Sequence, residues 1–334
     1  MNHIQGSFFY NTGMKLLKVT AYTTLAGIGL VLSIFVVARF QQETQSIDEK
    51  TCAQAPGLFM QLAGGKTHYQ LLGNKENDLL VLIHGGGITG MEVWNTNASF
   101  LALHGYQVLV YDLYGRGYSD RIAGDYTPEL LLNQLNELIK ALNLRDSMSV
   151  ISMSMGSIVA LDFATQHPDK VKSLVMIDPA IMGDYRANPL LKIPIVSDLL
   201  MTLYWYPRAV ENQRKEFVDQ KLFDTYKIRL EYFMNFKGYK AMNHSTWLYT
   251  LTQNKSELLR QIFPNKIQLI YGDHDPYFSN ITATKLQALY PTLEQKVIAG
   301  AGHMPHFEKP DIVNPLVLDF LKSTSYQSTI KKPE

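Results

Sequence analysis

Cysteine is almost absent from this sequence, since Cys52 is the only one among 334 residues. A single thiol cannot form an intrachain disulfide, and it excludes a zinc site built on a cysteine pair. The chain also lacks an excess of charge of either sign: its formal net charge is +1, and it has no basic run of useful length. A nucleic-acid-binding surface is therefore not expected. Internal repeats and low-complexity segments are lacking as well.

What the chain does contain is one long hydrophobic segment near its start, residues 19–38. About 20 residues that each rise about 1.5 Å suffice to cross a hydrocarbon core about 30 Å thick. Lys15 and Lys18 precede the segment, whereas acidic residues soon dominate after Arg39. The positive-inside rule then favours a cytoplasmic N-terminus, which places the main domain on the non-cytoplasmic side of a membrane.

The same segment admits a second interpretation, a signal peptide whose removal yields a secreted protein. Val36-Val37-Ala38 resembles a cleavage site with small residues. The leader before the apolar run is long, however, and the run exceeds the usual signal core, so an uncleaved single-pass anchor is the leading interpretation. The start of the chain accordingly divides into an N-terminal tail and membrane anchor, residues 1–40, and a polar linker, residues 41–56.

Downstream of the linker, strand-like runs alternate with helical patterns. Residues 58–62 and 66–72 are typical of a hairpin with a glycine turn, and residues 78–83 form the continuous apolar run of a strand buried on both faces. Further strands are expected at residues 107–111, 148–153, 171–177, 267–271 and 294–298, and helices at 130–142 and 310–322. This alternation predicts an α/β fold with a doubly wound, mostly parallel sheet.

The alternation stops between residues 183 and 245. This stretch is rich in tyrosine, leucine, methionine and phenylalanine, and prolines divide it into several short helical patterns. A helical insertion inside a parallel sheet is a cap. The expected domains are therefore a core in two parts, residues 57–182 and 246–325, a helical cap at residues 183–245, and a C-terminal tail at residues 326–334.

A serine stands at the junction between a strand and a helix. The strand-like residues 148–153 lead directly into a helical pattern, and Ser154 lies between them, with Ser152 two positions before it and Gly156 two positions after. In a nucleophile elbow this turn is so tight that only small side chains fit beside the serine, whose hydroxyl is exposed above the sheet edge. The usual pattern is Gly-x-Ser-x-Gly. Ser152 departs from it, but its side chain is small enough for the turn to close.

Four further motifs follow predicted strands in a fixed order. They are His84-Gly85-Gly86-Gly87, Asp112-x-x-Gly115-x-Gly117-x-Ser119-Asp120, Gly272-Asp273-His274-Asp275 and Gly300-Ala301-Gly302-His303. From about residue 57 to residue 323 the chain resembles an α/β-hydrolase with a helical cap. Combined with the N-terminal anchor, it is similar to serine hydrolases of the monoacylglycerol-lipase or carboxylesterase type. The Asp112 to Asp120 segment resembles a family turn that shapes the core and has no expected chemistry.

The resemblance implies a triad in the chain order serine, acid, histidine. Ser154 is the implied nucleophile, and it needs an adjacent base because a serine hydroxyl is weakly nucleophilic at its own pKa. His303 lies in a glycine-flanked loop after the last strand, where the family has its base, and is preferred to the nearby His306. His84 is expected to maintain backbone geometry.

Three carboxylates could orient that histidine. Asp275 matches the family's Gly-x-x-Asp spacing after the strand at residues 267–271 and is the leading candidate. Asp178 ends the preceding strand, where some α/β-hydrolases carry their acid, and Asp273 is more typical of a turn. The acid would hold the imidazole in one tautomer and stabilise the imidazolium that forms when the serine is deprotonated.

The oxyanion of a tetrahedral intermediate requires two N–H donors already in place. The resemblance assigns one to the backbone of Met155 and the other to the glycine loop, with Gly86 as the candidate. Neither an organic cofactor nor a metal is expected. His274 stands between two aspartates, but neighbouring side chains in an extended loop point in alternating directions and would not converge on one ion.

These features predict a serine hydrolase that cleaves carboxylic esters, of lipids or other hydrophobic acids, through an acyl-enzyme. Apolar cap residues from Leu190 to Tyr206 could line an acyl-chain tunnel, contact a bilayer, or pack the cap on the core. The expected partners are a small hydrophobic ester and a membrane contacted through residues 19–38. Two alternatives remain open. One is a carbon–carbon bond hydrolase of the ring-fission-product type, whose members have similar His-Gly-Gly-Gly and Ser-Met-Gly motifs. The other is a catalytically silent fold used for binding.

Overall fold

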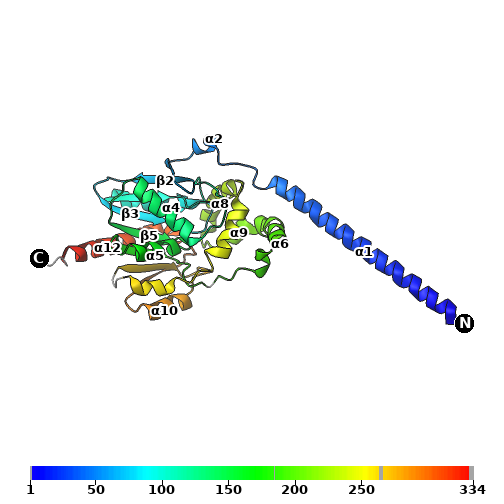
Figure 1. Ribbon diagram of the computed structural model, residues 1–334. Coiled ribbons are helices and arrows are strands. Elements are labelled where there is room, and N and C mark those ends of the chain that lie inside the picture. Colours follow the sequence, from blue (N-terminus) through cyan, green and yellow to red (C-terminus); the bar gives the residue numbers. More distant parts are fainter. Residues whose placement is uncertain (1, 184, 263–265, 331–334) are drawn as a thin grey trace.

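An eight-stranded sheet forms the centre of the molecule (Figure 1). The computed structural model describes residues 2–183, 185–262 and 266–330. The strands are β1 (Leu58–Gln61), β2 (Lys66–Leu72), β3 (Asp78–Ile83), β4 (Tyr106–Tyr111), β5 (Met148–Met153), β6 (Val171–Ile177), β7 (Ile267–Gly272) and β8 (Glu294–Ile298). Their spatial order is β1-β2-β4-β3-β5-β6-β7-β8. Strand β2 pairs antiparallel with β1 and β4, and the other pairs are parallel, which confirms the predicted mostly parallel sheet.

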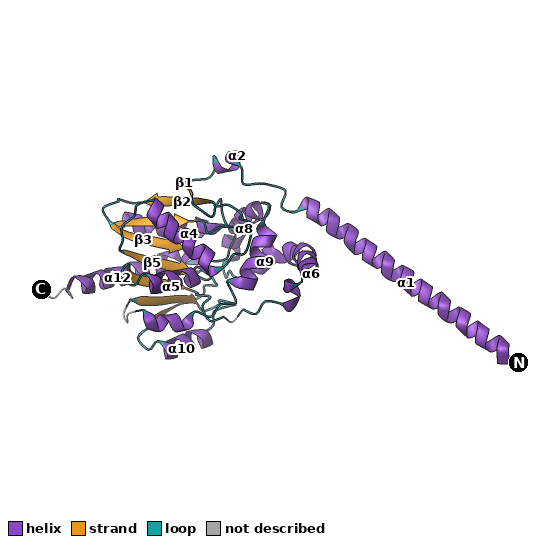
Figure 2. Ribbon diagram, viewed as in Figure 1, coloured by secondary structure: helices purple, strands orange, loops and turns teal. Residues whose placement is uncertain are grey.

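Helices cover both faces of this sheet (Figure 2). On one face, α3 (Asn95–Leu103) packs on β4 and on α12 (Pro310–Ile330). On the other, α5 (Gly156–Gln166) packs on β3, β5 and β6 and contacts α4 (Pro128–Ala141). The remaining short elements of the core are η1 (Gly90–Trp94), η5 (Ser256–Gln261), α10 (Asn280–Leu289) and α11 (Pro305–Glu308). Because both faces are covered, β4 and β5 are buried along their whole length and consist mostly of apolar residues.

Local chemistry explains where one predicted helix begins. The amphipathic pattern predicts a helix over 130–142, but α4 begins at Pro128. The side chain of Thr127 accepts a hydrogen bond from the N–H of Leu130, and proline occupies the first turn, where a missing N–H carries no penalty. Capping therefore extends the helix beyond the apolar pattern.

The helical insertion lies between β6 and β7. Its elements are η2 (Pro189–Lys192), α6 (Pro194–Leu199), the π-helical turn η3 (Leu200–Trp205), η4 (Tyr206–Arg208), α7 (Ala209–Arg214), α8 (Gln220–Met234) and α9 (Tyr239–Tyr249). Prolines stand in the first turn of η2, α6 and η4, which is why this segment breaks into short pieces. Helix α9 continues past residue 245, the expected end of the cap.

The N-terminal segment forms one continuous helix, α1 (Asn2–Gln41), which projects away from the globular body (Figure 1). Between Lys15 and Gln41 it is unburied and has a mean hydropathy of 2.0. Four of its hydroxyl groups donate to carbonyl oxygens of the preceding turn at 2.8 to 3.1 Å; they belong to Thr20, Thr23, Thr24 and Ser33. These four hydroxyls are therefore already paired within the helix, as an apolar environment requires. The helix is long and apolar enough to span a membrane.

The polar segment after α1 is partly ordered against the cap. It contains a short helix, α2 (Glu49–Cys52), and Gln45 forms a parallel bridge with Phe236. The expected linker at residues 41–56 therefore includes a docked section. The expected tail at residues 326–334 falls in part outside the described residues, and α12 extends to Ile330.

Candidate active site

Ser154 occupies a sharp turn between β5 and α5. Its φ is +49°, a left-handed conformation that is uncommon for a residue other than glycine. The strained turn is held by two backbone hydrogen bonds: its N–H donates to Ile177 O at 2.9 Å, and its carbonyl accepts from Ala180 N at 3.1 Å. A Cβ on Gly156 would lie 2.5 Å from the carbonyl oxygen of His84, so only glycine fits there. This is the geometry of a nucleophile elbow.

Ser152, the departure from the usual elbow pattern, fits the strand without strain. It is fully buried in β5, and its φ is not among the left-handed values that require glycine. Its hydroxyl lies 3.0 Å from Ser157 Oγ and 3.3 Å from Val175 O. The position therefore needs a small side chain rather than glycine itself.

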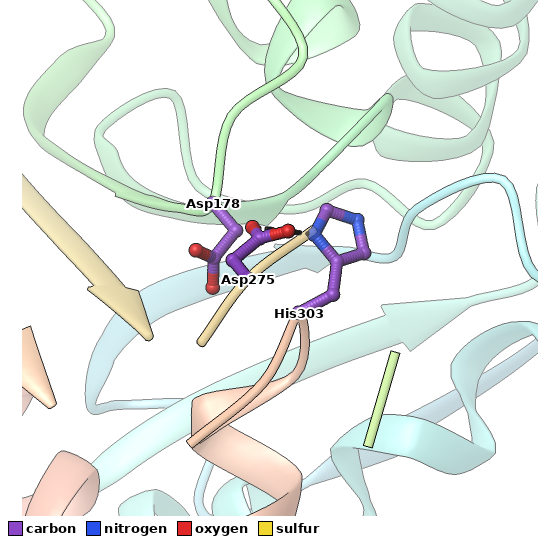
Figure 3. Close-up of side chains that lie close together, drawn as sticks. All are labelled: Asp178, Asp275 and His303. Atoms are coloured by element: carbon purple, nitrogen blue, oxygen red, sulfur yellow. Dashed lines mark hydrogen bonds and ion pairs between the residues drawn. The ribbon is translucent and has the colours of Figure 1, made fainter. Parts of the chain in front are cut away.

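Three predicted side chains meet at the carboxyl edge of the sheet. His303 Nε2 lies 2.9 Å from Ser154 Oγ, and His303 Nδ1 lies 2.7 Å from Asp275 Oδ2, the contact drawn in Figure 3. Asp275 follows β7 and His303 follows β8, so the parallel register of these strands brings the two loops together. The second oxygen of Asp275 accepts the N–H of Tyr277 at 2.7 Å. Serine, histidine and carboxylate thus form a continuous hydrogen-bonded chain.

His306 and Asp273, the alternative candidates for the base and the acid, lie away from Ser154. His306 is buried against the ring of Trp94 at 4.2 Å, and burial lowers its pKa to about 3. Asp273 accepts the N–H of Gly300 at 2.7 Å and contacts the exposed His274, which makes it a turn residue. Neither reaches Ser154.

Asp178 does reach the site. Its carboxylate lies beside that of Asp275 in Figure 3, and their ligand atoms and those of His303 are within 4.8 Å of one another. Burial, together with the charge of Asp275, raises the pKa of Asp178 well above its ordinary value. Asp178 Oδ1 accepts the N–H of Gly272 at 3.2 Å, and Oδ2 has no partner among the described residues. A neutral Asp178 removes the repulsion that two adjacent carboxylates would otherwise suffer.

This cluster is poorly built for a metal ion. Zinc ligands stand about 2.0–2.2 Å from the ion, which separates tetrahedral ligand atoms by about 3.4 Å. The 2.7 Å between His303 Nδ1 and Asp275 Oδ2 instead matches a charge-assisted hydrogen bond. The cluster therefore suits a carboxylate that orients the histidine and stabilises its protonated form.

The predicted oxyanion donors come from two neighbouring segments, the loop after β3 and the start of α5. Met155 is the N-cap of α5, and a Cβ on Gly86 would lie 3.9 Å from its sulfur. Within the described residues, no acceptor is bonded to the N–H of either residue. Gly86 also lines the cavity above Ser154. Both N–H groups are thus free to bind an oxygen that the substrate brings.

His84 has the structural role expected of it. It is buried, its Nε2 accepts the N–H of Leu113 at 2.9 Å, and its Nδ1 contacts Gly85 O at 2.7 Å. Burial lowers its pKa to about 4, so it stays neutral and keeps the glycine loop in place. The turn after β4 is likewise structural, because Asp112 binds His68 Nδ1 at 2.7 Å and the N–H of Tyr118 at 2.9 Å.

A cavity of about 1080 Å³ opens above the serine, between core and cap. This is slightly above the range of about 300–1,000 Å³ usual for small-molecule sites. Apolar side chains supply much of its wall, among them Ile88, Leu191, Leu200, Met201, Trp205 and Leu251. The cavity can therefore hold a long hydrophobic group.

Two polar groups in this cavity were not predicted. Tyr277 donates its hydroxyl to Glu216 Oε1 at 3.1 Å, and its ring packs edge-on against His303 at 5.0 Å. The backbone oxygen of Glu216 accepts the N–H of His303 at 2.8 Å, so the cap contacts the histidine loop directly. Burial raises the pKa of Glu216 to about 7. No local pattern in the sequence marks Glu216, because its position depends on how the cap folds back.

The charges around His303 predict the acid side of the pH profile. Burial alone lowers its pKa, but the charges of Asp275 and Glu216 outweigh burial and raise the pKa above the ordinary 6.5. A general base must be neutral, so activity is lost as pH falls through this raised pKa. We expect the acid limb of kcat/KM, measured on a water-soluble ester, to have its midpoint above pH 6.5.

Glu216→Gln provides the matched control for this profile. Removing the carboxylate charge should move the acid limb to lower pH, since one of the groups that raise the pKa of His303 is gone. A limb at or below pH 6.5 that is also unchanged in Glu216→Gln would contradict the assignment of His303 as the base.

Comparison with known proteins supports this fold. The alpha/beta hydrolase fold family matches residues 78–310. The chain belongs to this family. Epoxide hydrolase 3 of Xenopus tropicalis is 26% identical over 296 residues, which cover 79% of this chain and 76% of that protein. Lipase 1 of Psychrobacter immobilis is 25% identical over 268 residues, 75% of this chain and 78% of the lipase. A meta-cleavage product hydrolase structure from Pseudomonas fluorescens superposes with a TM-score of 0.66 at 20% identity, covering 80% of this chain and 98% of that one.

These relatives are all hydrolases, but they carry out different reactions. Family membership therefore establishes an alpha/beta hydrolase fold and supports hydrolase activity. The bond that is cleaved has to be inferred from this chain's own residues.

Proposed function

We propose that the protein is a serine hydrolase that cleaves carboxylic esters with a hydrophobic acyl group. The observation that best supports this is the unbroken chain from Ser154 Oγ through His303 to Asp275, at 2.9 and 2.7 Å, beneath a large apolar cavity. A serine with an adjacent imidazole and an orienting carboxylate is suited to attack a carbonyl carbon.

The reaction proceeds in two halves, formation of an acyl-enzyme and its hydrolysis. His303 Nε2 takes the proton of Ser154 while Oγ bonds to the ester carbonyl carbon, and the N–H groups of Gly86 and Met155 stabilise the resulting oxyanion. When the ester C–O bond breaks, the imidazolium gives its proton to the departing alcohol and an acyl-enzyme remains. His303 then takes a proton from water as the water oxygen attacks the acyl carbon. When the bond from the acyl carbon to Ser154 Oγ breaks, the imidazolium returns this proton to Oγ, and the acid and the free serine are released. Asp275 stabilises the imidazolium in both halves.

The N-terminal helix gives this activity a location. We propose that α1 anchors the chain in a membrane, with the catalytic domain on the non-cytoplasmic side as Lys15 and Lys18 favour. An anchored enzyme with an apolar cavity suits a substrate that dissolves in lipid. Cleavage of α1 as a signal peptide would instead release a secreted hydrolase.

A carbon–carbon bond hydrolase is the second candidate, since a structural relative acts on meta-cleavage products. Substrates that carry free carboxylates would need cationic partners in the cavity. Lys215 is the single lysine or arginine among the described residues of the cavity wall. The walls therefore favour an uncharged, hydrophobic substrate.

We expect kcat/KM of the full chain to rise at least about tenfold from a butanoate to an octanoate ester of the same alcohol. Each buried methylene contributes about 0.8 kcal/mol, so four of them allow such a gain even when burial is incomplete. The measurement is a series of monoacyl esters in mixed micelles, with Ser154→Ala as the blank.

A preference for the shortest ester would exclude the lipid part of the proposal. Cleavage of a ring-fission substrate without any ester hydrolysis would support the carbon–carbon alternative.

A further inference from the structure

The segment that joins α1 to the core is fastened to the cap. We call residues 39–45 the strap. The guanidinium of Arg39 donates to both carboxylate oxygens of Asp198 in α6, at 2.6 and 2.8 Å. At the other end of the strap, Gln45 N donates to Asn235 O at 2.9 Å, and Gln45 O accepts from Lys237 N at 2.8 Å. Side-chain and backbone bonds thus hold both ends of the strap.

A buried cation shows that the cap is built to receive the strap. Lys240 is only 6% exposed, and its Nζ lies 2.9 Å from Gln42 Oε1 and 3.5 Å from Glu43 Oε2. Glu43 is the one carboxylate paired with it in the described part of the chain, and it also accepts the N–H of Lys240 at 2.6 Å. A buried ammonium without a partner is strongly unfavourable. Removing the strap would take away the counter-charge of Lys240 and leave the hydroxyl of Thr202, 3.2 Å from Nζ, as its remaining hydrogen-bond acceptor among the described residues.

The cap surface next to the strap is apolar and exposed. We call Leu190, Ile193, Ile195 and Tyr204 the cap patch; Ile195 is 78% and Tyr204 59% exposed. Arg208 stacks on the ring of Tyr204 at 4.3 Å. Apolar side chains bordered by a tyrosine and a basic residue are typical of surfaces that lie in the headgroup region of a bilayer.

The strap, the cap patch and the cavity converge on one turn. Turn η3 packs against α1, and Gln42 Nε2 donates to Thr202 O within it at 3.1 Å. The same turn carries Tyr204, which belongs to both the patch and the cavity wall. In Figure 1, α1 leaves the body on the side where α6 lies. A bilayer entered by α1 is therefore close to the part of the cavity wall that Tyr204 forms.

We propose that the strap holds the cap patch against the phospholipid bilayer that α1 enters, so that a hydrophobic ester passes from the lipid into the cavity beside Tyr204. The route of the ester rests on the proposed function. The contact between cap patch and bilayer rests on α1 and the strap alone. The membrane contact and the route of the ester can therefore be rejected independently of each other.

The membrane contact is tested with the full chain in phosphatidylcholine vesicles. On a Cys52→Ser background, a fluorophore is attached at Ile195→Cys or, as the control, at Leu103→Cys. Leu103 is 87% exposed and directly precedes β4, so it lies at the amino edge of the sheet, opposite the cavity. Burial of the patch by about 5–10 Å predicts about twofold or greater quenching at position 195 by doxyl-labelled lipids, and none at 103.

The strap is tested by charge reversal. Asp198→Arg should reduce the quenching at position 195 and lower kcat/KM for an octanoate ester held in the vesicles, while butanoate ester hydrolysis in solution is retained. Adding Arg39→Asp should restore both, because the ion pair is rebuilt with reversed polarity.

Equal quenching at positions 195 and 103, or none at 195, overturns the proposal whatever the enzyme hydrolyses. Unchanged quenching in Asp198→Arg removes the strap's role. Quenching at 195 in a chain that cleaves no ester would leave the membrane contact standing and overturn the proposed function.

Discussion

Replacing Ser154 with alanine is expected to lower kcat for ester hydrolysis by about 10⁴- to 10⁶-fold, because Ser154 is the hydroxyl that lies beside His303 Nε2 in the described part of the chain. The fold should persist, since His303 is the one hydrogen-bond partner of the Ser154 hydroxyl among the described residues. The variant should also lose covalent labelling by a fluorophosphonate, which reacts with an activated serine. Mass spectrometry of the labelled wild type should place the adduct on Ser154.

Ser152→Ala is the matched control for this experiment. Ser152 is buried and bonds to Ser157 and Val175 behind the turn, away from the cavity. Its alanine variant should retain labelling and most of kcat. Labelling that survives in Ser154→Ala would assign the nucleophile to another residue. A folded wild type that never labels would favour the catalytically silent alternative.

Replacement of Asp275, the proposed acid of the triad, should also have a large effect on catalysis. Asp275→Asn should lower kcat by about 10⁴-fold, because an amide no longer stabilises the imidazolium and allows the wrong tautomer of His303. The Asp275 carboxylate is ionised in the resting site: burial raises its pKa, but His303 and other hydrogen-bond donors outweigh burial and bring the pKa below the usual value. Its negative charge is therefore available to His303 at neutral pH.

Asp178→Asn distinguishes the role of Asp178 from that of the neighbouring Asp275. Because burial and the charge of Asp275 raise the pKa of Asp178 and favour its neutral form, an isosteric amide should reduce kcat far less than Asp275→Asn does, and pre-steady-state acylation rates should show the same order. A loss in Asp178→Asn as large as that in Asp275→Asn would make Asp178 the acid of the triad.

Short-range patterns in the sequence were sufficient for the architecture. The apolar run at residues 78–83 became β3 with those limits, and residues 148–153 became β5. The small residues around Ser154 indicated the elbow because the steric limits of a strand-to-helix turn act within a few residues. Periodicity and turn chemistry are local properties, so sequence alone determined the fold class and marked the loops that carry Ser154, Asp275 and His303.

Only the tertiary structure distinguished between nearby candidates. His303 lies in the loop after β8 and His306 three residues later in α11, and their side chains contact Ser154 and Trp94 respectively. The pairing of Asp178 with Asp275 depends on adjacent strand ends, and the contact of Glu216 with the histidine loop depends on how the cap folds back.

The contacts of the strap likewise became apparent only in the tertiary structure. The sequence predicted only a polar linker at residues 41–56, because nothing local marks Glu43 as the partner of a buried lysine about two hundred residues away. Sequence determined where strands, turns and the apolar helix lie, since those follow from interactions between near neighbours. The fold decided which side chains share a charge, a proton or a cavity, because these depend on burial and on contacts between distant segments.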